Sequence, residues 1–212
     1  MNQRLQSHIF WGPHAPLSAM TGGALLIMAS QRLAFALFCA WGLIWVFSLT
    51  ALAYFSAKDF MPAKGRPVIL LFLSSFICSV YLLLAAFLNP LLVQTAWFFL
   101  ILVPPCCIGS GILEQLENLD PGESLPRVFL EALCLGLLII ALSLIREPLG
   151  LGSLSLPGGP GGIFELFSSE DPGGFFPVRI FSVSSGGLLL LGYILAVFRY
   201  FRSQYTGTED EL

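Results

Sequence analysis

The chain has 212 residues, of which 56% are hydrophobic and only 11% are charged, and its mean hydropathy is +0.84. This composition excludes an ordinary water-soluble domain and is typical of a polytopic membrane protein. The formal net charge of −3 and the lack of a basic patch in the sequence give no sign of nucleic-acid binding.

Six apolar runs come close to or reach the roughly 17–25 residues that a helix needs to cross hydrocarbon. In chain order they are 15–29, which is short, and then 33–56, 67–88, 91–113, 128–145 and 178–198. We therefore predict an all-α polytopic membrane protein of six transmembrane helices, with residues 1–212 forming a single membrane domain. We expect no cleaved signal peptide, because no small-residue cleavage pattern follows the first apolar run.

The distribution of lysine and arginine predicts the orientation of these spans. With six crossings, seven basic residues lie on the side of the two termini and three lie on the other side, which favours cytoplasmic termini. The first group is Arg4, Lys58, Lys64, Arg66, Arg127, Arg199 and Arg202, and the second is Arg32, Arg146 and Arg179. The tail 200–212 is then cytoplasmic, and the Gly- and Pro-rich connection 146–177 is predicted to be an irregular outer loop. This assignment counts 15–29 as a full crossing.

Two of the predicted spans contain residues that interrupt a helix. Gly22 and Gly23 interrupt the first span, and Pro104 and Pro105 interrupt the fourth, where proline removes a backbone donor and clashes with the preceding turn. Each broken span opens a set of three, so we predict inverted repeats over about 15–88 and 91–199. Such breaks either hold an ion, a charged substrate or a metal cluster, or only let helices pack closely.

Five cysteines, at positions 39, 78, 106, 107 and 134, all lie inside predicted spans, which argues against the disulfide framework of a small secreted domain. Cys106 and Cys107 follow the proline pair, where a half-helix N-terminus would stabilise a thiolate. An iron–sulfur cluster needs four ligands, and adjacent helical residues face different directions. The other three cysteines are expected to be small buried hydrophobic residues.

Three charged residues near the fifth span are further candidates. Glu131 is the only carboxylate inside a predicted span, and such a residue is a functional candidate. The alternative, which we favour, is that Glu131 stabilises the first turn of the helix, four residues after Arg127. Arg146 and Glu147 close the same span, and we expect them to form a structural cap at the membrane surface.

Two stretches resemble the paired six-span membrane subunits of the Rnf electron-transport complex and of the related sodium-translocating NADH:quinone oxidoreductase. The run 107-CIGSGILEQLE-117 is similar to the family's Cys-x-x-x-Gly-x-x-Glu stretch after the break in the fourth span, with matches at Cys107, Gly111 and Glu114.

The run 145-IREPLGLGSL-154 resembles the family's Arg-Glu-x-x-Gly-x-Gly-x-Leu ending of the fifth span. The matching residues are Arg146, Glu147, Gly150, Gly152 and Leu154. With both termini inside, this motif points to the E-type Rnf subunit or its D-type counterpart. A homologous six-span sister subunit of opposite topology, and other Rnf-type subunits, are the partners that the resemblance implies.

The resemblance also implies a cofactor, because two homologous family subunits together hold a 2Fe-2S cluster in mid-membrane through one cysteine from each broken helix. Cys107 stands at the second ligand position, and Cys106 is a candidate substitute. At the first position, where the family has Gly-x-Cys-Pro, the chain reads 22-GGALLIM-28, so that Ala24 replaces the cysteine. The chain therefore departs from the family at one of its two ligand positions.

Three functions remain open from the sequence. The first is a subunit of a redox-driven ion-translocating oxidoreductase in a prokaryotic inner membrane, which carries electrons with its sister subunit and is not catalytic alone. The second is a small permease or channel component, and the third is a structural scaffold subunit with no redox cofactor.

Overall fold

The computed structural model describes residues 24–60, 62, 65–110, 116, 121–158, 161–167 and 178–207. Five long or medium α-helices make up most of this part of the chain: α3 (Leu33–Ala57), α4 (Arg66–Leu88), α5 (Pro90–Ile101), α8 (Pro121–Leu151) and α9 (Ser184–Gly207). Shorter elements connect them: the 3-10 helices η2 (Ala24–Gln31), η3 (Lys58–Phe60) and η5 (Arg179–Phe181), the short helix α6 (Val103–Gly109), and the strands β1 (Leu154–Pro157) and β2 (Ile163–Phe167).

Among the described residues, four helical stretches are long and apolar enough to cross a membrane: Leu33–Ala57, Arg66–Leu88, Pro90–Gly109 and Gly122–Leu151. A shorter apolar stretch, Ser184–Val197, lies in α9. The prediction of a mostly helical polytopic membrane protein is thus confirmed. Six crossings and the inverted repeat stay predictions, because residues 15–23 of the first predicted span lie outside the described residues.

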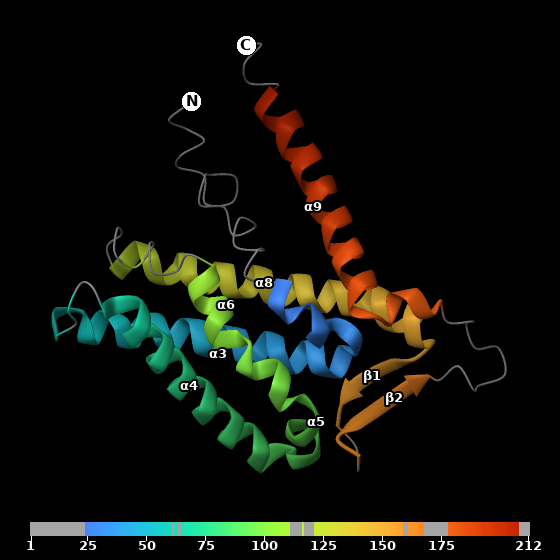
Figure 1. Ribbon diagram of the computed structural model, residues 1–212, viewed down its shortest axis with the longest axis horizontal. Helices are drawn as coiled ribbons and strands as arrows, with labels where there is room; N and C mark the ends of the chain where they lie inside the picture. Colours follow the sequence, from blue (N-terminus) through green and yellow to red (C-terminus); the bar gives the residue numbers. More distant parts are fainter. Residues whose placement is uncertain are drawn as a thin grey trace.

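Helix α3 lies at the centre of the bundle and packs against both α8 and α4 (Figure 1). Small residues let the backbones approach, since a Cβ atom added at Gly136 of α8 would lie 3.2 Å from the Cβ atom of Ala40 in α3. Close approach of this kind is how helices associate in a membrane, where hydrophobic burial gives no advantage over lipid. Helix α9 starts beside the end of α8 and leads away from α3 (Figure 1).

The turn between α4 and α5 is set by two consecutive residues. Asn89 caps α5, because its Oδ1 atom accepts a hydrogen bond from the backbone N–H of Leu92 at 3.1 Å, and Pro90 takes the first helical position. An Asn cap followed by proline is a strong helix-start signal. The turn also contacts the strands, since Asn89 Nδ2 donates to the carbonyl of Gly162 at 3.2 Å.

The connection 146–177 is not wholly irregular, and this prediction was wrong in part. Helix α8 continues to Leu151, and β1 and β2 then form an antiparallel hairpin in which Ser155 pairs with Glu165. Glycines allow the turns: Gly152 has a φ of 66°, and Gly162 has a φ of 81°, values that side chains with a Cβ rarely adopt. The fold is therefore helical with one small β-hairpin rather than purely all-α.

Candidate functional site

The break in the fourth predicted span lies at Leu102, between α5 and α6, two residues before Pro104. The position follows from proline chemistry, because Pro104 has no N–H to donate to the carbonyl of Leu100 four residues earlier. That carbonyl instead accepts from Cys78 Sγ of α4 at 3.3 Å. The thiol therefore compensates for a backbone bond that the proline removes, and the helix resumes with the N–H of Cys106 donating to the carbonyl of Leu102 at 3.1 Å.

Cys106 and Cys107 lie directly after this break, and both are 0% exposed. They belong to the main hydrophobic core, in which α6 packs against α3 and α4. Cys39 and Cys78 are buried in the same core, whereas Cys134 is half-buried. Both candidate ligands therefore lie beneath side chains of their own chain.

Glu131 lies deeper in its helix than the sequence predicted. It is 2% exposed, and α8 begins at Pro121 rather than near residue 128, so Glu131 stands almost three turns inside the helix. The first-turn explanation for this acid was wrong, because the favourable effect of a helix N-terminus is confined to the first turn. Glu147 also falls within the membrane-length part of α8, so Glu131 is not the only carboxylate there.

The resemblance implies a metal cluster, and the positions of the possible ligands among the described residues bear on whether this chain could hold it. The described residues contain no group of three or more His, Cys, Asp and Glu side chains that could hold a metal ion. A cluster shared with a second subunit would need a thiolate that reaches the partner, yet both Cys106 and Cys107 are fully enclosed. Ala24, at the start of η2, offers no thiol. The described residues of this chain thus give no support to a shared cluster, and Cys107 as a ligand stays a prediction.

Arg146, near the end of α8, joins three segments that are far apart in the sequence. Its guanidinium Nη1 donates to the carbonyl of Ile27 at 2.8 Å and to Ser30 Oγ at 2.6 Å, both in η2. On the other side, Nε donates to the carbonyl of Phe181 at 3.0 Å and Nη2 to that of Val183 at 3.2 Å. Arg146 is 1% exposed, so the expected cap at the membrane surface is in fact a buried joint.

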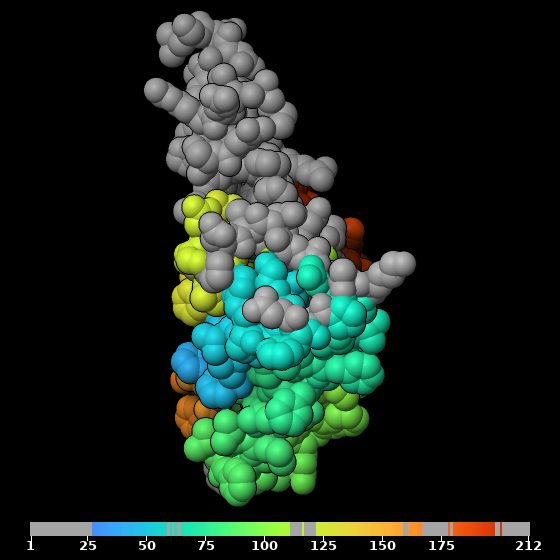
Figure 2. Space-filling view, turned by 90° about the vertical axis from the view of Figure 1, so that its left-hand side faces the viewer, coloured from blue at the N-terminus to red at the C-terminus, as the bar shows by residue number. Residues whose placement is uncertain are grey.

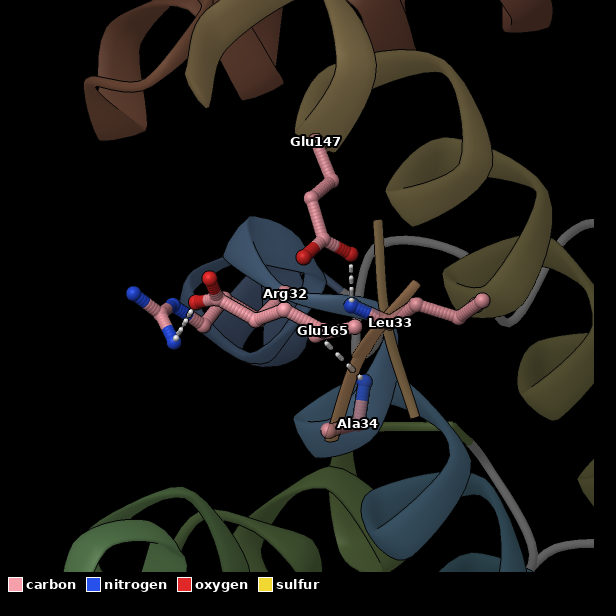
Figure 3. Close-up of polar contacts among 6 residues, drawn as sticks. Arg32, Leu33, Ala34, Glu147 and Glu165 are labelled. Carbon is pink, nitrogen blue, oxygen red and sulfur yellow. Dashed lines mark hydrogen bonds and ion pairs between the residues drawn. The ribbon is translucent and has the colours of Figure 1, made fainter. Parts of the chain in front are cut away.

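Glu147 serves a different helix from its neighbour. Its Oε2 atom accepts a hydrogen bond of 2.6 Å from the backbone N–H of Leu33 (Figure 3). This N–H is one of the donors that the first turn of α3 leaves without a helical acceptor, and an anionic acceptor there also interacts favourably with the helix dipole. The next N–H, of Ala34, donates to Ser155 Oγ of β1 at 3.4 Å, so α8 and the hairpin together cap α3.

The hairpin is also tied to the start of α3 by a surface ion pair. Arg32 Nη1 lies 3.4 Å from Glu165 Oε1 of β2 (Figure 3). Gly150 completes the joint, since a Cβ atom there would lie 2.7 Å from the backbone N of Ser182. The Arg-Glu-x-x-Gly-x-Gly stretch is thus a packing unit. The hairpin beside it could have been predicted from the sequence, because apolar segments lie on both sides of the Gly- and Pro-rich residues 157–162, which is a hairpin signal.

Four of the sequence candidates cannot be placed. Gly22 and Gly23, the predicted first break, lie outside the described residues, as do Gly111 and Glu114 of the first family-like stretch. What the structure describes after the first break is η2, which packs against α8, α3, α9, α5 and α6. The end of the first predicted span is therefore close to the second break.

A family model described as "Rnf-Nqr subunit, membrane protein" matches residues 8–195, which includes both predicted breaks and the joint at the end of α8. A comparison with curated proteins gave no match.

Proposed function

The chain belongs to the Rnf-Nqr family of membrane subunits, and from this premise we propose that it serves in an Rnf-type ion-translocating electron-transport complex. In this proposal the chain is of the E type or its D-type counterpart, and it helps to carry electrons across the membrane together with a homologous sister subunit of opposite topology. The observation that carries the proposal is the extent of the family match, because it covers residues 8–195 and so both halves of the chain.

Exposed apolar surface supports a partner inside the membrane. Five large apolar side chains of α4 are strongly exposed: Phe72, Phe76, Leu83, Phe87 and Leu88. Lipid or another membrane helix can cover such a surface. Purification in a mild detergent, followed by mass spectrometry, tests the association directly. Recovery of this chain without any homologous six-span subunit, under conditions that keep other membrane complexes intact, would contradict the proposal.

The orientation in the membrane is part of the same proposal. The start of α3, the α4–α5 turn and the hairpin lie at one end of the bundle, as the contacts Leu33–Glu147 and Asn89–Gly162 require. The seven-to-three distribution of basic residues favours the outer face for this end. Accessibility labelling of single cysteines introduced at positions 168 and 203 tests it. A cytoplasmic label at position 168 or an external label at position 203 would reverse the topology.

A second candidate is favoured by a specific observation. Ala24 stands where the family has its first cysteine, and both thiols of the second break are fully buried. These facts support a scaffold subunit that holds the complex together but binds no redox cofactor. Iron analysis and electron paramagnetic resonance (EPR) show whether the purified complex contains an iron–sulfur cluster. Electron transfer by a complex that lacks this chain shows whether the chain is needed for it. Together these measurements separate the two candidates.

A further inference from the structure

A groove of about 420 Å³ lies between α3, α4 and the start of α5, and neither a cysteine nor Arg146 lines it. Its wall is formed by Phe38, Trp41 and Trp45 of α3 and by Tyr81, Leu84 and Leu88 of α4. Figure 2 shows side chains of these two helices next to each other on one face of the molecule, α3 in blue and cyan and α4 in teal and green. A volume of this size is typical of a small-molecule site.

The base of the groove is a fixed aromatic cluster. The hydroxyl of Tyr81 donates to the carbonyl of Phe38 at 3.0 Å, and the ring of Tyr81 lies 5.5 Å from that of Phe38 and 6.4 Å from that of Trp45. Beneath it the helices touch, since a Cβ atom at Gly42 would lie 2.5 Å from Leu100 Cδ2. The groove is therefore part of the packing of α3, α4 and α5.

The mouth of the groove opens toward hydrocarbon rather than water. Trp41 is 65% exposed there and Leu88 is 89% exposed, and both residues belong to helices that are long and apolar enough to span the membrane. Two polar side chains on the wall are already engaged, Tyr81 with Phe38 and Asn89 with Leu92 and Gly162. Apart from the indole N–H groups of Trp41 and Trp45, the wall therefore presents apolar surface, which favours an apolar ligand.

The length of the groove restricts the ligand further. It runs from Asn89 and Pro157, at the hairpin end of the bundle, to Trp45. Along α4 its wall extends from Tyr81 to Asn89, which is eight residues or about 12 Å at 1.5 Å per residue. One leaflet is about half of the roughly 30 Å hydrocarbon core, or about 15 Å, so the groove extends through most of one leaflet.

We propose that this groove binds one acyl chain of a membrane phospholipid from the leaflet at the hairpin end. The chain lies along α3 and α4 against Trp41, Trp45 and Tyr81, and the headgroup stays at the level of Asn89 and the hairpin. Hydrophobic burial gives no advantage over lipid in a membrane, so retention rests on van der Waals contact. The walls of the groove contact an acyl chain on more sides than the open faces of α4 do, and therefore retain it more strongly. This site is independent of any electron transfer by the chain.

The test uses the purified complex in vesicles of phosphatidylethanolamine and phosphatidylglycerol, which contain a small fraction of phosphatidylcholine with a photoreactive diazirine on its acyl chain. After irradiation, mass spectrometry maps the labelled residues. Ala85→Phe places a ring in the groove, whereas Ala86→Phe makes the same change at the neighbouring position, which does not line it. A second pair, Leu84→Trp and Leu83→Trp, compares a lining position with an exposed position outside the groove.

We expect labelling between Phe38 and Trp45 to fall about tenfold in Ala85→Phe and Leu84→Trp, equivalent to 1.4 kcal/mol, and to stay unchanged in the two controls. Equal labelling in all four variants would show only unspecific lipid and would overturn the proposal. A quinone recovered in place of phospholipid would also overturn it. That outcome is a real competitor, because the buried indole N–H of Trp45 has no acceptor among the described residues. A crosslinked protein segment in the groove would overturn the proposal as well.

Discussion

Replacing Arg146 by alanine removes the side chain that joins η2, the end of α8 and the residues before α9. In the wild type the guanidinium donates to the carbonyls of Ile27, Phe181, Ser182 and Val183 and to the hydroxyl of Ser30. In the variant these oxygens stay close together in the protein interior but lose a charged donor. We expect η2 and the start of α9 to separate from α8.

The magnitude follows from the number and burial of these contacts. Hydrogen bonds to a charged group contribute about 1.5–3 kcal/mol each, but the five share one side chain that is itself costly to bury, so their values do not add. The variant leaves several buried oxygens without a donor, at about 1–3 kcal/mol for each that stays unsatisfied, and loss of a buried hydrogen-bond network is among the most destabilising single changes. We therefore expect a loss of about 3–5 kcal/mol. At about 2–4 °C per kcal/mol for a chain of this size, the midpoint of thermal unfolding should fall by roughly 6–20 °C.

The assay is thermal unfolding of the purified complex in detergent, monitored by loss of the monodisperse species. Arg32→Ala is the matched control, because Arg32 lies at the same end of the molecule but forms a partly exposed ion pair with Glu165 at 3.4 Å, and such pairs contribute about 0–1 kcal/mol. If the two arginine variants unfold at the same temperature, the buried joint does not stabilise the protein as reasoned here.

Three further predictions concern single positions. Glu147→Ala should lower the free energy of unfolding by about 1–2 kcal/mol, as loss of a helix cap does, and should speed hydrogen exchange at the N–H of Leu33. Glu147→Gln keeps an acceptor oxygen and should lose less stability. Equal losses in the two variants would contradict the capping role. Gly187→Ala should destabilise the protein by about 1–3 kcal/mol, because its Cβ atom would lie 2.7 Å from Nη1 of Arg146. Gly192→Ala, whose Cβ atom would have nothing within 4 Å, should stabilise it by about 0.5–1 kcal/mol. Thermal unfolding compares the two variants. Cys107→Ser distinguishes the two candidate functions. In a scaffold subunit the buried thiol has only a packing role, so the iron content and EPR spectrum of the complex should stay unchanged at a cost on the order of 1 kcal/mol. Loss of a 2Fe-2S signal would make Cys107 a ligand.

The long helices were predictable because uniform apolar runs leave few alternatives in a membrane. The predicted spans 33–56 and 67–88 differ from α3 (Leu33–Ala57) and α4 (Arg66–Leu88) by only one residue at one end. The fifth span was predicted to begin after Pro126, but α8 includes this proline and begins at Pro121. A helix can continue through proline where other groups satisfy the freed carbonyl, and this error misplaced Glu131.

The site was less predictable, for a physical reason. Four of the five acceptors of Arg146 are backbone carbonyls, and these belong to residues 119 positions before it or 35 to 37 positions after it. A carbonyl is present at every residue, so no sequence pattern marks which one will accept. The Arg-Glu pair itself was visible, but its role in joining distant segments depends on tertiary packing alone.

The cap of α3 also has a consequence for the order in which the protein can be completed during synthesis. The N–H of Leu33 waits for a carboxylate that lies 114 residues later in the chain. At roughly 5–20 residues per second, Glu147 is made about 6–23 s after Leu33. During that interval the start of α3 must stay near water or an insertion factor, because lipid offers its donors no acceptor. The first helices therefore reach their final arrangement only after α8 has entered the membrane.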